Sequence, residues 1–306
     1  MTVAIISHPD CALHDMGSHH PESPARLAAI QDRLIASGLD TVLLHHDAPA
    51  ATREQLCRVH APDYVEYVFQ KSPAEDRSWL DPDTCMNPHS LSAALHAAGA
   101  VVLGVDLVMS GESASAFCNV RPPGHHAESG RAMGFCIFDN IAVGAAHALA
   151  AHGLQRVAIV DFDVHHGNGT EDIFRDQPKV LFCSTFQHPF YPHTGAQTDS
   201  DHIINVPMAA GTDGAAFRAA VETHWFPRLE AFAPEMLFIS AGFDAHVEDP
   251  LADLRLVESD YAWITAELKR IADRHAGGRI VSSLEGGYAL SALGRSAAVH
   301  IDALLG

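Results

Sequence analysis

One short stretch of this chain limits most strongly what the chain can fold into. Residues 157–170 read VAIVDFDVHHGNGT. The apolar start predicts a short buried strand, and two acids and two histidines follow: Asp161, Asp163, His165 and His166. Buried strands rarely carry acids, because a desolvated carboxylate is costly unless it is paired or bound to a metal. The stretch therefore predicts a strand that ends in a polar site.

Asp163 and His165 are the best candidates for metal ligands in this stretch. They are two residues apart, so in an extended chain their side chains leave on the same side. A carboxylate oxygen and an imidazole nitrogen together suit a borderline divalent ion such as zinc. The alternative is a strand end whose acids cap the next helix. Capping needs only one acid, whereas this stretch has two acids and two histidines.

A second strand end offers a third ligand. Residues 236–253 read MLFISAGFDAHVEDPLAD. Its apolar start predicts another buried strand, and Gly242 permits a turn that points Asp244 off the carboxyl end of that strand. In an open parallel sheet, sites form beyond the carboxyl ends of the strands. We therefore expect Asp163, His165 and Asp244 to converge and to leave one position for water, as in a catalytic metal site.

Adjacent histidines follow a third predicted strand, residues 115–120, in the motif RPPGHH. His125 and His126 could be a second metal pair. They could also be an acid–base dyad in which each histidine has a partner that fixes its tautomer. Asp161 and Asn168 are the partners available beside the metal strand.

A tyrosine follows a fourth predicted strand and its glycines, in the stretch IVSSLEGGY that ends at Tyr288. A phenol held over the metal could donate a hydrogen bond to the oxyanion of a tetrahedral intermediate. Equally, the motif could be only a helix start with a packed ring.

Taken together and in this order, these motifs resemble the histone deacetylase/acetylpolyamine amidohydrolase family. The resemblance runs from about His8 to near the C-terminus. It is carried by RPPGHH at 121–126, GFCIF at 134–138, DFDVHHGNGT at 161–170, AGFDAHVEDP at 241–250 and EGGY at 285–288. It implies an α/β arginase–deacetylase fold, with a mainly parallel β-sheet flanked by helices on both faces, and zinc-dependent hydrolysis of an N-acyl amide.

The resemblance also implies a role for each matching residue. One zinc ion per chain would be held by Asp163, His165 and Asp244. The catalytic set would be His125, His126, Asp161, Asn168 and Tyr288. Asn168 stands where class I deacetylases carry aspartate. In this departure the sequence resembles class II members and acetylpolyamine amidohydrolases. His126 would act as the base. Asp161 would keep His125 more cationic, whereas neutral Asn168 would orient His126 without raising its pKa.

Further residues match the family's substrate tunnel. Phe135, beside Gly134, and Tyr191 would wall a narrow tunnel for a linear methylene chain and bury its CH₂ groups at about 0.8 kcal/mol each. Asp83 resembles a rim residue that hydrogen-bonds the substrate backbone or amine. Leu251 stands at a rim position where relatives specialised for polyamines carry glutamate, which weakens the polyamine alternative.

Other positions have both a family role and an ordinary one. Arg26 matches an arginine on an internal channel associated with acetate release, and its ordinary role is that of a helix-surface arginine. Ser184 matches a residue at a monovalent-cation site, such as one for potassium, that also involves Asp161, Asp163 and His165; otherwise it is a strand serine. We expect the loop that carries His14, His19 and His20 to lie at the rim without binding metal.

Composition limits the class of protein and its partners. The 306 residues are 47% hydrophobic and contain no linker or repeat, which predicts one domain over residues 1–306. The net charge is −19, which disfavours direct nucleic acid binding and favours cationic substrates such as lysine-rich tails or polyamines. Six cysteines without C-x-x-C spacing indicate reduced thiols. We expect a cytoplasmic protein without a leader or a membrane span; the oligomeric state stays open.

Strand and helix patterns alternate along the chain. We expect further strands at residues 3–7, 41–45 and 180–185, and we expect the strand before Tyr288 to span 279–284. Residues 71–83 form a polar segment. We expect helices from Ser23 to Gly38 and at 62–70, 91–109, 140–152, 170–174, 213–232, 259–275 and 290–305.

The sequence supports four functional hypotheses. The first is an acyl-lysine deacylase acting on peptides or proteins, and the alternative with the same chemistry is an acetylpolyamine deacetylase. The third is an arginase-like hydrolase, which would need further acids in place of the histidine pair. The fourth is a non-catalytic acyl-lysine binding module, which the complete set of ligands, bases and phenol disfavours.

Overall fold

A parallel sheet forms the centre of the molecule. The computed structural model describes residues 2–306, and within them eight strands pair in the order β2-β1-β5-β10-β9-β6-β7-β8. Every neighbouring pair in this sheet is parallel. The strands are β1 (Val3–Ser7), β2 (Leu44–Asp47), β5 (Ser115–Cys118), β6 (Val157–Asp161), β7 (Val180–Gln187), β8 (Ile203–Met208), β9 (Met236–Ala241) and β10 (Ile280–Leu284).

Successive residues of the inner strands supply two different cores. Ala4 and Ile6 of β1 belong to one buried cluster, whereas Val3 and Ile5 belong to the other. Side chains alternate between the faces of a strand, so a strand that is covered on both faces must be apolar at nearly every position. This explains the continuous apolar runs that the sequence analysis interprets as strands.

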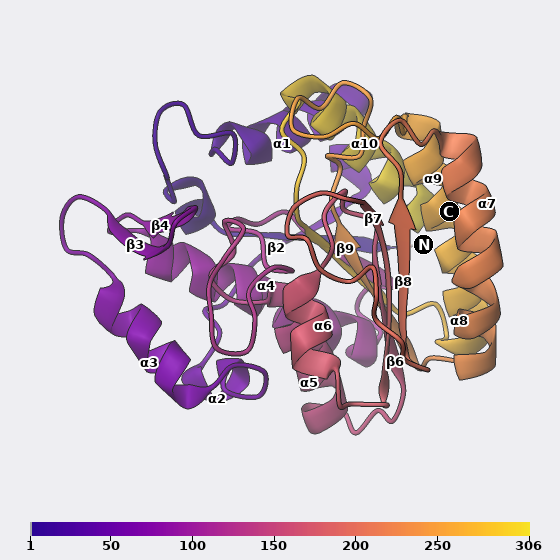
Figure 1. Cartoon of the computed structure of the whole chain (residues 1–306), viewed down its shortest axis with the longest axis horizontal. Coiled ribbons are helices and arrows are strands. Elements are labelled where there is room, and N and C mark those ends of the chain that lie inside the picture. Colours follow the sequence, from indigo (N-terminus) through magenta and orange to yellow (C-terminus); the bar gives the residue numbers. More distant parts are fainter. Residues whose placement is uncertain (1) are drawn as a thin grey trace.

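Helices cover both faces of the sheet (Figure 1). One face carries α2 (Arg53–Leu56), α3 (Pro62–Lys71), α4 (Ser90–Ser110), α5 (Asn140–Ala151) and α6 (Asn168–Phe174). The other carries α1 (Ala25–Ser37), α7 (Gly214–His224), α8 (Phe226–Phe232), α9 (Glu258–His275) and α10 (Leu290–Leu305). The expected parallel sheet with helices on both faces is confirmed.

Helix α4 is long and apolar enough, by length and composition alone, to cross a membrane. We expected no segment of this length and composition, and that expectation is wrong. In the structure, α4 packs on β1, β5 and β10, and 67% of its apolar window is buried within the protein. It is a core helix.

Several elements differ from the expectations. The helix expected over 213–232 is broken at Trp225, because Pro227, in the first turn of α8, has no N–H to continue α7. A 3₁₀ helix, η2 (Leu39–Val42), precedes β2 and shifts it beyond 41–45. The polar segment 71–83 contains the strand β3 (Ser78–Asp81), which forms an antiparallel hairpin with β4 (Thr84–Met86). No strand was expected over residues 203–208, where the edge strand β8 contains Pro207.

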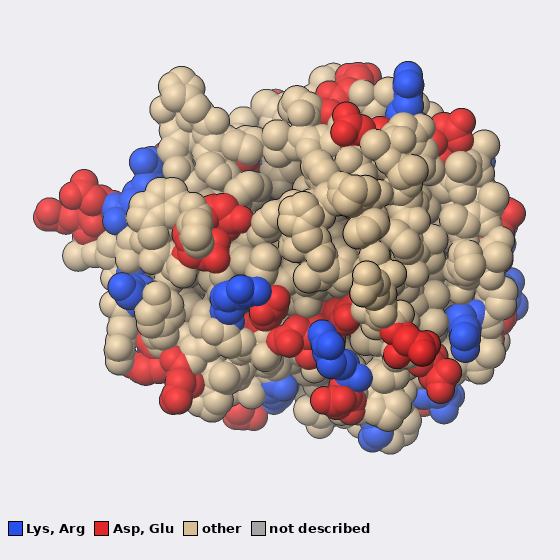
Figure 2. All heavy atoms as spheres, in the orientation of Figure 1, with Lys and Arg blue, Asp and Glu red and all other residues tan. Residues whose placement is uncertain are grey.

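The topology gathers the motifs at one edge. The strands β5, β10, β9 and β6, which precede the four motifs, are consecutive neighbours in the sheet. Because parallel strands end at the same edge, the loops after them meet there. On the face drawn in Figure 2, Lys and Arg side chains are scattered among acids and form no continuous basic patch.

Candidate metal centre and active site

Asp163, His165 and Asp244 converge just beyond β6 and β9. The Nδ1 atom of His165 lies 2.9 Å from Oδ1 of Asp163 and 3.3 Å from Oδ2 of Asp244. Ligand atoms of all three residues lie within 4.8 Å of one another. Both aspartates are buried, and the His165 side chain is 13% exposed. The structure therefore brings together the three residues that the sequence predicts as metal ligands.

The surroundings of the two carboxylates fit a cation. The Gly286 N–H donates to Oδ2 of Asp163 at 2.9 Å, and the Val164 N–H donates to Oδ1 of Asp244 at 3.0 Å. The second oxygen of Asp244, Oδ2, is buried and has no hydrogen-bond partner among the described residues. Such an oxygen is costly to bury. Two carboxylates and one imidazole are a donor set that zinc accepts, so the residues present fit that ion.

The electric field at this point also favours a positive charge. Burial opposes a charge on His165, but Asp163 and Asp244 beside the ring raise its pKa to about 10. Burial alone would raise the pKa of Asp163, whereas the neighbouring His125 and His165 hold it well below its ordinary value. The same two carboxylates that attract a proton to His165 would attract a divalent cation.

Gly286 has no room for a side chain. A Cβ atom at this position would lie 2.0 Å from Oδ2 of Asp244 and 2.6 Å from Oδ2 of Asp163. The glycine of the EGGY motif is therefore required by the close approach of its backbone to the two carboxylates.

His126 presents a free ring nitrogen. Its Nδ1 atom lies 2.7 Å from Oδ1 of Asn168. The amide nitrogen of Asn168 donates to Glu128 at 2.9 Å, so the amide oxygen is the atom that faces the ring. Nδ1 of His126 therefore carries the proton and Nε2 keeps its lone pair, which is the tautomer that a general base requires.

His125 has a charged partner instead. Its Nδ1 atom lies 2.8 Å from Oδ2 of Asp161. Burial opposes the charge, but Asp161 and Asp163 raise the pKa of His125 well above its ordinary value. Burial and the charges of His125 and His165 hold the pKa of His126 well below its ordinary value. The two rings, 4.0 Å apart between centroids, thus form one cationic and one neutral imidazole, in the directions expected from the sequence.

A narrow cavity of about 230 Å³ leads to this centre. It is lined by Asp83, His126, Gly134, Phe135, His165, Tyr191, Leu251 and Tyr288. The Phe135 and Tyr288 rings stand perpendicular at 6.3 Å between centroids. A Cβ atom on Gly134, which has φ +59°, would lie 2.3 Å from Cδ2 of His126, so only glycine allows this wall to stand so close. A narrow aromatic cavity suits a linear aliphatic chain.

Asp83 lies in the turn of the β3–β4 hairpin. This hairpin was not expected from the sequence. Its Oδ1 accepts a hydrogen bond from the Gly134 N–H at 2.9 Å, and its Oδ2 accepts one from the Tyr191 hydroxyl at 3.1 Å. Asp83 therefore joins the two predicted walls of the cavity. Leu251, at the mouth, is 36% exposed.

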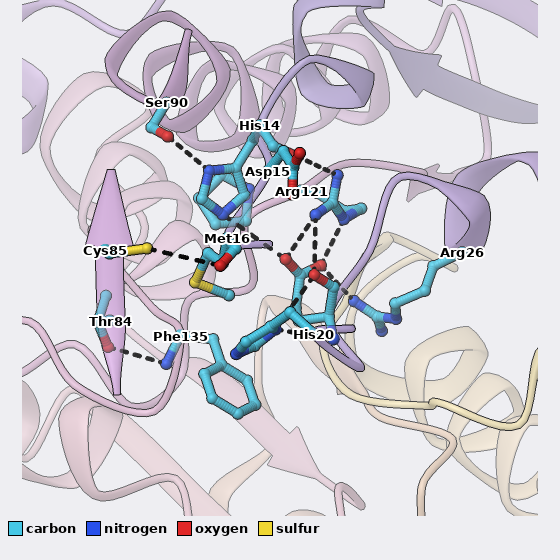
Figure 3. A network of polar contacts seen from close by, with 12 residues as sticks. His14, Asp15, Met16, His20, Arg26, Thr84, Cys85, Ser90, Arg121 and Phe135 are labelled. Carbon is cyan, nitrogen blue, oxygen red and sulfur yellow. Dashed lines mark hydrogen bonds and ion pairs between the residues drawn. The ribbon is translucent and has the colours of Figure 1, made fainter. Parts of the chain in front are cut away.

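Figure 3 shows a network of polar contacts that includes Arg26 and Arg121. Through Arg26, this buried network supports the loop that carries Tyr288. Arg26 is fully buried, so its interpretation as a helix-surface arginine is wrong. It donates to the carbonyl oxygens of Gly287, at 2.7 Å, and of Glu285. Its Nη1 lies 3.0 Å from Oε1 of Glu22. The Asp249 carboxylate holds the same loop by accepting from the Tyr288 N–H at 2.7 Å.

Glu22 connects this network to the histidine loop. Its Oε2 lies 2.6 Å from Nη2 of Arg121, the first residue of RPPGHH. Burial alone would raise the pKa of Glu22, but Arg121 and Arg26 lower it to about 2. Glu22 was missed in the sequence analysis, because nothing in a single sequence pairs it with an arginine 99 positions away.

The N-terminal histidines divide between the interior and the surface. His14 is buried, its Nδ1 lies 2.7 Å from Ser90 Oγ, and burial lowers its pKa to about 4. The expected rim position is therefore wrong for His14. His19 is exposed, and the His20 ring packs edge-on against Phe135 at 4.6 Å.

Two further buried groups lie near the centre. Ser184 pairs in register with Asp161, and its hydroxyl has no hydrogen-bond partner among the described residues. Glu285, also missed, accepts from the Gly124 and His125 N–H groups at 2.7 and 3.2 Å. Burial raises its pKa to about 8. An acid between an apolar strand and two glycines is a signal that could have identified it.

Comparison with known proteins agrees with this geometry. The profile described as "Histone deacetylase domain" matches residues 20–304. A histone deacetylase-like amidohydrolase of Pseudomonas aeruginosa is 39% identical, over 88% of this chain and 72% of that protein. The human polyamine deacetylase HDAC10 is 35% identical, over all of this chain and 48% of that protein. The crystal structure of the HDA15 HD domain superimposes with a TM-score of 0.94 at 36% identity, covering 99% of this chain and 88% of that one.

Proposed function

The chain belongs to the histone deacetylase family and is a hydrolase acting on amides, and we propose that it removes acetyl or other acyl groups from lysine side chains in peptides or proteins with the help of zinc. One observation carries the proposal. Asp163, His165 and Asp244 meet at the floor of a narrow aromatic cavity that also exposes His126 and Tyr288.

Asp163, His165 and Asp244 would hold the zinc ion. When bound there, zinc would supply Lewis-acid chemistry, lowering the pKa of a water molecule and polarising the amide carbonyl. We further propose a monovalent cation such as potassium near Asp161 and Ser184, beside the metal ligands. The buried Ser184 hydroxyl, which has no hydrogen-bond partner within residues 2–306, supports that second ion.

The remaining groups would move protons and stabilise charge. His126 takes a proton from the attacking water at Nε2 and delivers it to the leaving nitrogen. His125, held cationic by Asp161, favours the negative charge that develops beside it. The Tyr288 hydroxyl donates to the carbonyl oxygen as that oxygen becomes negative. Arg26, which holds the backbone of the same loop, would keep Tyr288 in place.

The alternative substrate is an acetylated polyamine. The similarity to a polyamine deacetylase and the net charge of −19 support this alternative. Leu251 opposes it, because an apolar side chain at the cavity mouth offers no charge to a second amine. We therefore favour acyl-lysine.

A substrate panel tests the proposal. Turnover of acetyl-lysine peptides, acetylated polyamines and longer acyl-lysines should be compared at equal concentrations. We expect kcat/KM to be highest for an acyl-lysine peptide and to disappear after metal chelation. Preference for the polyamine would replace the favoured substrate with the alternative. Failure to cleave any amide with zinc restored would contradict the proposal as a whole.

A further inference from the structure

A second cluster of metal-ligand side chains lies outside the cavity, between α4 and α5. The Nε2 atoms of His147 and His152 lie 2.9 and 2.7 Å from the same carboxylate oxygen, Oδ1 of Asp106. His147 is on α5, His152 follows its last turn, and Asp106 is on α4. Ligand atoms of the three residues lie within 4.8 Å of one another.

The spacing resembles that of the cavity centre. There, the corresponding nitrogen-to-oxygen distances are 2.9 and 3.3 Å. The helix cluster is therefore about as compact as a set of residues that fits zinc. It differs in being open to water, because the side chains of Asp106 and His152 are 49% and 25% exposed.

Ring orientation separates this cluster from a third candidate group, His8, Asp10 and His96. A metal binds the lone pair of an imidazole nitrogen and so lies in the plane of the ring. The His8 and His96 rings are stacked 3.5 Å apart at an interplanar angle of 7°, so one ion cannot lie in both planes. The His147 and His152 rings meet at 78°. Their planes cross, and one ion can lie in both.

We propose that Asp106, His147 and His152 form a second site for a divalent transition metal, with water completing the coordination. Two imidazoles and one carboxylate suit zinc and its neighbours in the first transition row. An ion bound there would join the end of α5 to α4. This inference does not depend on the proposed function, because none of the three residues lines the cavity.

Arg58 competes with metal binding at His147. Its Nη1 lies 2.9 Å from Nδ1 of His147, and an arginine can only donate. Nδ1 is therefore the acceptor, and the ring proton is on Nε2, facing Asp106. When a metal takes the lone pair of Nε2, this proton moves to Nδ1 and Arg58 must leave. Glu54, whose Oε1 lies 3.1 Å from Nη2 of Arg58, offers the guanidinium another partner.

Zinc titration tests the proposal. Protein that already contains one equivalent of zinc is titrated with a second by calorimetry, as wild type, His152→Ala and His45→Ala. His45 is a matched control, because it is an exposed histidine 3.2 Å from one aspartate, Asp40, and belongs to no candidate metal cluster among the described residues. We expect the wild type and His45→Ala to bind the second equivalent at least about tenfold more tightly than His152→Ala. Equal binding by the wild type and His152→Ala would overturn the site.

Arg58→Gln tests the competition separately. We expect this variant to bind the second equivalent more tightly than the wild type, because a glutamine amide oxygen can accept a hydrogen bond from a protonated Nδ1 of His147, whereas arginine can only donate. Zinc should also raise the Tm of the wild type more than that of His152→Ala, since a ligand that binds only the folded state stabilises it. Equal Tm shifts would contradict the site, and weaker binding by Arg58→Gln would contradict the proton shift.

Discussion

Two clusters of aspartate and histidine in this molecule have similar donor atoms but different surroundings. In the strand-end cluster, formed by Asp163, His165 and Asp244, both aspartates are buried. In the helix cluster, formed by Asp106, His147 and His152, the aspartate side chain is 49% exposed. At the strand ends, backbone N–H groups donate to both oxygens of Asp163 and to one oxygen of Asp244. At the helices, both imidazoles bond one carboxylate oxygen directly.

The two clusters depend on a cation to different extents. Burial removes water from Asp244, and its Oδ2 has no hydrogen-bond partner among the described residues. The His165 ring lies 3.3 Å from this oxygen without forming a hydrogen bond. A buried carboxylate oxygen that lacks a hydrogen bond is costly, so a cation there would relieve a penalty. Asp106 is hydrated, and exposed ion pairs contribute little. A cation at the helix cluster would therefore add stability without being required by the fold.

The largest contrast should come from removing one aspartate of each cluster. Asp244→Asn should lower kcat/KM on an acetyl-lysine peptide by about a thousandfold or more, because the set that fits the metal loses a charged ligand. Asp106→Asn should leave kcat/KM unchanged. Steady-state kinetics and the zinc content of both variants check this. A comparable loss in Asp106→Asn would remove the distinction between the two clusters.

Tyr288→Phe separates catalysis from metal binding within the strand-end region. Loss of the hydroxyl donor should lower kcat by about 100- to 1000-fold, or about 3 kcal/mol, while the bound zinc stays at the wild-type level. Tyr67→Phe, at a half-exposed phenol away from the cavity, is the control and should be silent. A Tyr288→Phe variant with near-normal turnover would show that the phenol does not stabilise the transition state.

Glu22→Gln tests whether a buried ion network contributes more to the free energy of unfolding than an exposed ion pair does. Removing one charge from a buried network leaves Arg26 and Arg121 uncompensated, so the free energy of unfolding should fall by about 3 kcal/mol. Glu66→Gln, at an exposed pair with Arg53, should leave it nearly unchanged. Urea unfolding of both variants measures this. Equal effects would contradict the importance of burial.

Buried histidines also predict a loss of stability in acid. Burial lowers the pKa of His60 to about 4 and that of His300 to about 3. Each is about 6.5 in the unfolded chain, which therefore binds more protons between these values. Their contribution is complete above about pH 6.5 and is lost as the pH falls toward 4 and 3, by up to about 1.4 kcal/mol per unit for each histidine. Urea unfolding from pH 7.5 to 4.5 should show this slope, and His300→Gln should reduce it. An unchanged slope would refute the contribution of His300.

Local sequence determined how much of the strand-end region could be predicted. Asp163 and His165 are two positions apart after an apolar run, and Asp244 follows another such run. Parallel pairing then places these strand ends at one edge of the sheet, and the observed strand order makes β6 and β9 neighbours. The double coverage of the sheet was predictable for the same reason, because continuous apolar strands need both faces buried.

The regions that could not be predicted depend on distant partners. Asp106 and His147 are 41 positions apart on two apolar helices, and each alone resembles an ordinary helix residue. His14 is buried, and its carbonyl oxygen accepts a hydrogen bond from Arg121, 107 positions away. The β3–β4 hairpin has strands too short and too mixed to show a clear alternation, although it positions Asp83 at the cavity. Sequence patterns report local periodicity, whereas these contacts arise from tertiary packing.

The most direct test of this account is zinc reconstitution of the metal-free protein, measured as turnover of an acetyl-lysine peptide. We expect no turnover without metal, and a rise that is complete at one equivalent of zinc in both the wild type and Asp106→Asn. We expect no rise in Asp244→Asn. Full turnover without metal, or restoration of Asp244→Asn by one equivalent of zinc, would contradict the assignment of the strand-end cluster as the catalytic metal centre.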